Sequence, residues 1–124
     1  MKFKCDKISV DDSELGLTII FSEKRKNSFD YEDTVNADSK YILIQLNYPE
    51  DEYEKYYSFI EFSDVKKSGN IDKYKFHLSK NEFIVKSKDE EVKCLFNISD
   101  EKFNEIKEVL ERIISGKNKL TIKE

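Results

Sequence analysis

The sequence predicts an α+β fold, with a mainly antiparallel meander sheet of six to eight strands and one C-terminal helix packed on one face. Two patterns carry this prediction. Segments in which apolar and polar residues alternate follow one another at hairpin spacing along most of the chain. A single stripe of apolar residues at helical spacing comes after them. Because 124 residues suit one core, we interpret residues 1–124 as a single domain.

The N-terminal part predicts two strands. Residues 2–10 alternate, but the apolar positions change parity midway, so we expect one strand with a bulge near Asp6 and Lys7. A turn at residues 11–14 precedes residues 17–21, which are nearly all apolar and therefore predict a more central strand.

A long polar loop, residues 23–40, separates these strands from the next pair. Loops of this length are uncommon in small domains, where they are usually functional or disordered. The strand predicted at residues 41–48 ends at Pro49, because proline cannot donate to a sheet ladder. The next strand is predicted at residues 56–63.

These two strands carry apolar side chains on both faces. Alternation places one set on a common face: Ile42, Ile44, Ile60 and Phe62. It places a second set on the opposite face: Tyr41, Leu43, Tyr57 and Phe59. If the helix packs on the first set of side chains, the second set must be shielded from solvent by something else. That cover is either the long loop, over a small second core, or a partner protein, since tyrosine is enriched at interface hot spots.

Three more strands are expected after a turn at residues 68–70. Residues 74–78, 83–85 and 92–98 have strand character and follow one another at hairpin spacing, which predicts an antiparallel meander.

The C-terminal helix has clear start and stop signals. Ser99 is a good N-cap and is followed by two acidic residues that suit the positive end of the helix dipole. Gly116 is a plausible stop, and residues 120–122 form either a short edge strand or a frayed end. The apolar stripe consists of Phe103, Ile106, Leu110, Ile113 and Ile114.

The charge balance narrows the function classes. The chain has 22 basic and 26 acidic side chains, a net charge of −4 and a pI of about 5.2. General nucleic-acid binders usually show a basic stripe and a high pI, so we predict no direct nucleic-acid binding. An acidic protein instead suits a basic protein partner, because complementary charge speeds encounter.

The sequence predicts a cytoplasmic protein without membrane contact. The N-terminus lacks the apolar run of a signal peptide, and no stretch approaches the roughly 20 apolar residues of a membrane span. Cys5 and Cys94 both fall in apolar strand patterns and are expected to be reduced core thiols. A disulfide between them is the alternative.

No residue pattern predicts a catalytic, metal or cofactor site. The single histidine, His77, lies between two lysines on a polar strand face and is expected to be exposed. Asp51, Glu52 and Glu54 lack the spacing and the central glycine of a calcium loop. The three glycines are too far apart to form a phosphate-binding loop. We therefore predict that the protein is not an enzyme.

An ordered set of segments resembles immunity protein family 10 of bacterial polymorphic toxin systems. The set begins with Tyr-x-x-x-Gln at 41–45, acidic residues at 51–52 and Tyr-Tyr-x-x-x-Glu at 56–61. It continues with the turn 68–71, the strands 76–78 and 83–85, and the helix 103–114. Two features depart from the family pattern. Leu46 stands where a basic residue is common, and the turn keeps only one glycine, Gly69.

The resemblance implies a contact-dependent inhibition function. The protein would be an immunity protein that binds and neutralises a cognate toxin domain in the bacterial cytoplasm by occluding its active site. From the charge of the chain we expect a basic toxin, such as a nuclease domain. The hypothesised toxin-binding residues are Gln45, Asp51, Glu52, Glu54, Tyr57 and Glu61. The alternatives are a non-catalytic interaction scaffold and, less favoured, a small enzyme.

Overall fold

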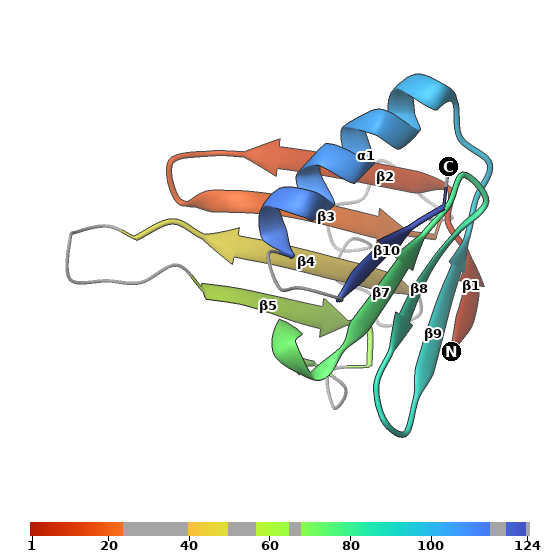
Figure 1. Cartoon of the computed structure of the whole chain (residues 1–124), viewed down its shortest axis with the longest axis horizontal. Coiled ribbons are helices and arrows are strands. Elements are labelled where there is room, and N and C mark those ends of the chain that lie inside the picture. The colour runs from red at the N-terminus through yellow and green to blue at the C-terminus, as the bar shows by residue number, and fades with distance from the viewer. Residues whose placement is uncertain (24–39, 50–56, 65–67, 115–118, 124) are drawn as a thin grey trace, which may run out of the picture.

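Figure 1 shows the fold of the chain as a computed structural model. The structure describes residues 1–23, 40–49, 57–64, 68–114 and 119–123. The predicted α+β class is confirmed, but the described strands number ten and form two five-stranded sheets instead of one.

Sheet A is mixed. Its strands in spatial order are β1 (Lys2–Lys4), β9 (Glu91–Leu95), β8 (Glu82–Lys86), β7 (Lys75–Leu78) and β10 (Leu120–Ile122). The three central strands form the predicted antiparallel meander. Both edge strands are parallel to their neighbours, β1 to β9 and β10 to β7. The 120–122 segment is therefore an edge strand, one of its two predicted states.

Sheet B is antiparallel throughout. Its strands in order are β2 (Lys7–Asp12), β3 (Gly16–Ser22), β4 (Tyr41–Asn47), β5 (Tyr57–Phe62) and β6 (Gly69–Asn70). A short 3-10 helix, Ile71–Lys73, leads from β6 to β7 and so joins the two sheets. The segment predicted as a turn, residues 68–70, therefore contains a short strand, β6, which is the fifth strand of sheet B.

One core lies between the sheets and the helix. The helix α1 (Asp100–Ile113) contacts β3, β4 and β10, so α1 and sheet A together cover the inner face of sheet B (Figure 1). Phe21 of sheet B stacks on Phe83 of sheet A, with ring centroids 4.6 Å apart. Because apolar residues alternate along the strands, each sheet sends one full set of side chains into this core.

The helix begins and ends as local chemistry requires. Ser99 is the N-cap, and its hydroxyl accepts a hydrogen bond from the Lys102 N–H at 3.1 Å. At the other end, the Ser58 hydroxyl donates to the carbonyl of Ile113 at 3.2 Å, which satisfies one of the free carbonyls of the last turn. The helix packs on one side of the sheet, as predicted. Gly116 lies outside the described residues, whereas the whole apolar stripe, between residues 103 and 114, lies within them. No described helix is long and apolar enough to cross a membrane.

The prediction of one bulged strand over residues 2–10 is wrong. The pairing breaks at Cys5 and Asp6, where the chain leaves sheet A as β1 and enters sheet B as β2. The change of parity has this physical cause: Phe3 faces the core from one sheet, and Ile8 packs against it from the other.

The two cysteines are neighbours in the core and are not bridged. Phe3 pairs with Cys94, and the Cys5 N–H donates to the carbonyl of Leu95 at 2.7 Å, which brings both thiols to the same region. A hydrogen bond from Cys94 lowers the pKa of Cys5, whereas the interaction with Cys5 and burial raise the pKa of Cys94. The prediction of two free core thiols is confirmed.

Candidate partner-binding face

The outer face of sheet B is the surface on which three of the six hypothesised toxin-binding residues meet. Since α1 and sheet A lie against the inner face, alternate residues of β3, β4 and β5 point the other way. We call this set the sheet B face: Thr18, Ile20, Tyr41, Leu43, Gln45, Asn47, Tyr57, Phe59 and Glu61.

An apolar band crosses the sheet B face. Ile20 pairs with Leu43, and both side chains are half-buried, as is Phe59 on the next strand. The ring of Tyr57 stacks on that of Phe59 at a centroid distance of 6.4 Å and is 60% exposed. Among the described residues, only one other large apolar side chain, Leu15, has comparable exposure. The band therefore carries an aromatic group that solvent reaches on one side and that packing holds on the other.

A polar pair lies beside this band. The Tyr41 hydroxyl donates to Oε2 of Glu61 at 2.7 Å. Burial of the phenol, this hydrogen bond and the negative charge of Glu61 raise the pKa of Tyr41 to about 12. The pair therefore presents a carboxylate in a fixed position, as a partner with a basic surface would require.

The titration of Tyr41 tests this geometry. The folded pKa lies above the ordinary tyrosine value of about 10, so the folded protein keeps a proton that the unfolded chain loses. The stability from this group is complete below about pH 10 and is lost as the pH rises toward 12. We expect an ultraviolet difference titration between the wild type and Tyr41→Phe to show a tyrosinate midpoint near 12. The Glu61→Gln variant should lower that midpoint, and a wild-type midpoint at the ordinary value would show that the pair does not form.

The structure brings together three of the six predicted site residues. Gln45 pairs with Phe59, which lies between Tyr57 and Glu61 on the same strand face. Gln45 is thus the diagonal neighbour of both Tyr57 and Glu61. The other three, Asp51, Glu52 and Glu54, lie outside the described residues.

Sequence reasoning missed the contribution of β3 to this face. The run at 17–21 is nearly all apolar, so its polarity predicts a central strand but does not separate its two faces. The burial pattern separates them, because Ile19 is fully buried and Ile20 is half-exposed. The signal is strand alternation. Thr18 pairs with Gln45 and therefore lies on the same face, and Ile20, two residues further along β3, lies on that face as well.

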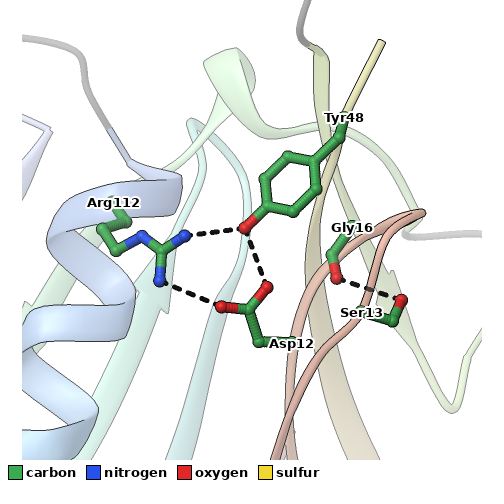
Figure 2. Close-up of polar contacts among 5 residues, drawn as sticks. All are labelled: Asp12, Ser13, Gly16, Tyr48 and Arg112. Atoms are coloured by element: carbon green, nitrogen blue, oxygen red, sulfur yellow. Dashed lines mark hydrogen bonds and ion pairs between the residues drawn. The ribbon is translucent and has the colours of Figure 1, made fainter. Parts of the chain in front are cut away.

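A second polar cluster lies at the C-terminal end of the helix (Figure 2). The Tyr48 hydroxyl donates to Oδ1 of Asp12 at 2.9 Å and accepts from the Arg112 guanidinium at 2.7 Å. The guanidinium also lies 3.3 Å from Oδ2 of Asp12. Burial and the hydrogen bond to Asp12 raise the pKa of Tyr48, while the charge of Arg112 opposes the rise. The three groups bind one another, so we interpret them as a polar network that links α1 to sheet B.

The histidine differs from its predicted environment. His77 is half-buried instead of exposed, because it pairs with Ile84 on one side and Thr121 on the other and lines an open hollow. The described residues include no cluster of three or more His, Cys, Asp or Glu side chains that could hold a metal ion.

Comparison of the chain with family models, with curated proteins and with solved structures gives no match. The candidate face is therefore defined by its own residues and geometry.

Proposed function

We propose that this protein is a non-catalytic immunity protein that neutralises a cognate toxin domain by covering its active site through the sheet B face. The observation that carries the proposal is the apolar band of that face, which reaches solvent at Tyr57 and lies on the side of the sheet opposite the core. The family resemblance of the ordered segments supports the identity of the partner as a toxin.

The composition of the face suits protein recognition. Interfaces place aromatic anchors at their centre and polar groups around them. Here Tyr57 and Phe59 supply rigid aromatic area, and Gln45 and Glu61 supply hydrogen-bonding groups on the same face. Both strands belong to a five-stranded sheet with a packed core behind it, so little order has to be gained on binding.

The charge of the chain favours a basic toxin domain. The net charge is −4, and the Glu61 carboxylate is held in place by Tyr41. A nuclease domain that binds phosphate with basic side chains would match this sign. In such a complex the protein would act in the cytoplasm of the producing cell, without chemistry of its own.

Capture of the partner tests the function. Tagged full-length protein is used to pull down partners from the native cell in high salt, and the captured protein is then expressed alone and together with this chain. We expect one stoichiometric partner that stops growth alone and is harmless in co-expression. Several weak partners, or a partner without toxicity, would instead favour the interaction scaffold.

Substitutions then test the face. Tyr57→Ala should weaken binding to the captured toxin by at least about tenfold, because truncation of an aromatic anchor typically costs more than about 1 kcal/mol. Leu15→Ala is the matched control, since Leu15 is 67% exposed and lies in the turn between β2 and β3, outside the residues that define the sheet B face. If Leu15→Ala weakens binding and Tyr57→Ala does not, the function stands but the contact surface lies elsewhere.

A further inference from the structure

The outer face of sheet A is basic, although the whole chain is acidic. Five outward-facing strand residues are lysines: Lys2, Lys4, Lys75, Lys86 and Lys93. Only two acidic residues, Glu82 and Glu91, share the strand positions of this face. The chain as a whole carries a charge of −4, so positive charge is concentrated on this side of the molecule. We call this surface the sheet A face.

Most of this charge is not neutralised within the described part of the chain. Lys86 lies 3.7 Å from Glu91, and both side chains are about half exposed. The four other lysines of the face make no ion pair with any described residue, and neither does Lys123, which follows β10. Exposed ammonium groups without partners give the surface a positive potential that attracts anionic ligands.

An apolar centre interrupts the lysines. One row of paired residues crosses all five strands from Thr121 through His77, Ile84 and Lys93 to Lys2. His77 and Ile84, in the middle of this row, are half-buried.

They line an open hollow of about 540 Å³, to which Lys86 and Lys123 also contribute. The hollow therefore combines an apolar surface with ammonium groups beside it, and it has room for a large side chain.

We propose that the sheet A face binds an acidic, extended peptide segment of a partner protein, with one apolar side chain in the hollow and its carboxylates on the lysines. Ile84 and Lys86, which lie two residues apart on β8 and both line the hollow, are separated by about 6.6 Å. Alternate side chains of an extended peptide have the same spacing. The surface is distinct from the sheet B face and does not depend on the proposed function.

A peptide fits this surface better than a nucleic acid does. Glu82 lines the hollow, and Glu91 lies among the lysines, so a continuous phosphate backbone would meet two negative charges. The outward-facing strand positions include no Phe, Tyr or Trp side chain on which a base could stack, and the one ring present, that of His77, is half-buried. Ile84 needs an apolar counterpart, which phosphates do not supply.

The test is a binding titration with the full chain. The probe is a fluorescein-labelled peptide of alternating glutamate and serine with one central leucine, measured by fluorescence anisotropy at low and moderate salt. A duplex DNA of similar charge and the same peptide without its leucine are the comparison ligands. We expect saturable binding that falls with salt, is tighter for the leucine peptide than for either comparison ligand, and weakens at least tenfold in Lys93→Glu/Lys123→Glu.

A second double variant separates position from total charge. Lys7→Glu/Lys102→Glu changes the net charge equally but lies on β2 and α1, away from the sheet A face. It should change the affinity less than about twofold. An equal loss in both double variants, tighter binding of the DNA, or no saturable binding of the peptide would each overturn the proposal.

Discussion

Replacing Phe83 with alanine is expected to lower the free energy of unfolding by about 3–5 kcal/mol. The ring is fully buried and lies where the two sheets meet. It stacks on Phe21 of sheet B at 4.6 Å and on Phe76 of its own sheet at 6.0 Å. Truncation would remove the contacts of both neighbours and leave a cavity that the surrounding packed side chains can close only in part.

Urea unfolding followed by circular dichroism measures this loss. Tyr57→Ala is the control, because it removes an aromatic ring of similar size that is 60% exposed on the sheet B face. We expect the control to cost less than about 1 kcal/mol, as exposed substitutions usually do. Equal losses in the two variants would mean that Phe83 is not the central contact between the sheets.

Replacing Gly16 with alanine is expected to cost about 1–3 kcal/mol through overpacking. A Cβ at this position would lie 2.5 Å from the backbone carbonyl oxygen of Leu46, closer than real contacts allow. That oxygen cannot move freely, since Gly16 pairs with Asn47 and Leu17 pairs with Leu46 in the ladder between β3 and β4. The backbone of Gly16 is not left-handed, so the cost comes from the contact and not from torsion.

The matched control is Gly69→Ala. No described atom outside Gly69 and its chain neighbours lies within 4 Å of a Cβ built on this residue, so the stability should change by less than about 0.5 kcal/mol. Thermal or urea unfolding of the two variants side by side gives the difference. If Gly16→Ala is as stable as the wild type, β3 and β4 do not approach as closely at this end as the structure shows.

Stability and binding should separate among these substitutions. Phe83 lies in the core, so its alanine variant should lose partner binding only to the extent that it unfolds. Tyr57 contributes little to the core, so its truncation should reduce binding while the protein stays folded. A variant set with this division identifies the sheet B face as a contact surface independently of its effect on the fold.

Local chemistry made much of the fold predictable. Ser99 and the periodic stripe after it predicted the helix to within one residue at its start, since capping and amphipathicity depend on neighbours in sequence. Alternation likewise placed Gln45, Tyr57 and Glu61 on one face, which the register confirms. The hairpins of the meander connect neighbouring strands, so spacing was enough to predict them.

Tertiary structure alone decided how the strands divide into sheets. Alternation states which residues share a face but not which sheet the strand joins, so the switch at Cys5 and Asp6 resembled a bulge. The parallel pairing of β1 with β9 joins residues as far apart as Lys2 and Lys93 and has no local signal. This pairing forms because it buries Phe3 and covers the free edge of β9. The free energy of that burial offsets the entropy of closing so long a loop, and it is gained only when the core assembles. The lysines of β1 and of β7 to β9 share a surface for the same reason.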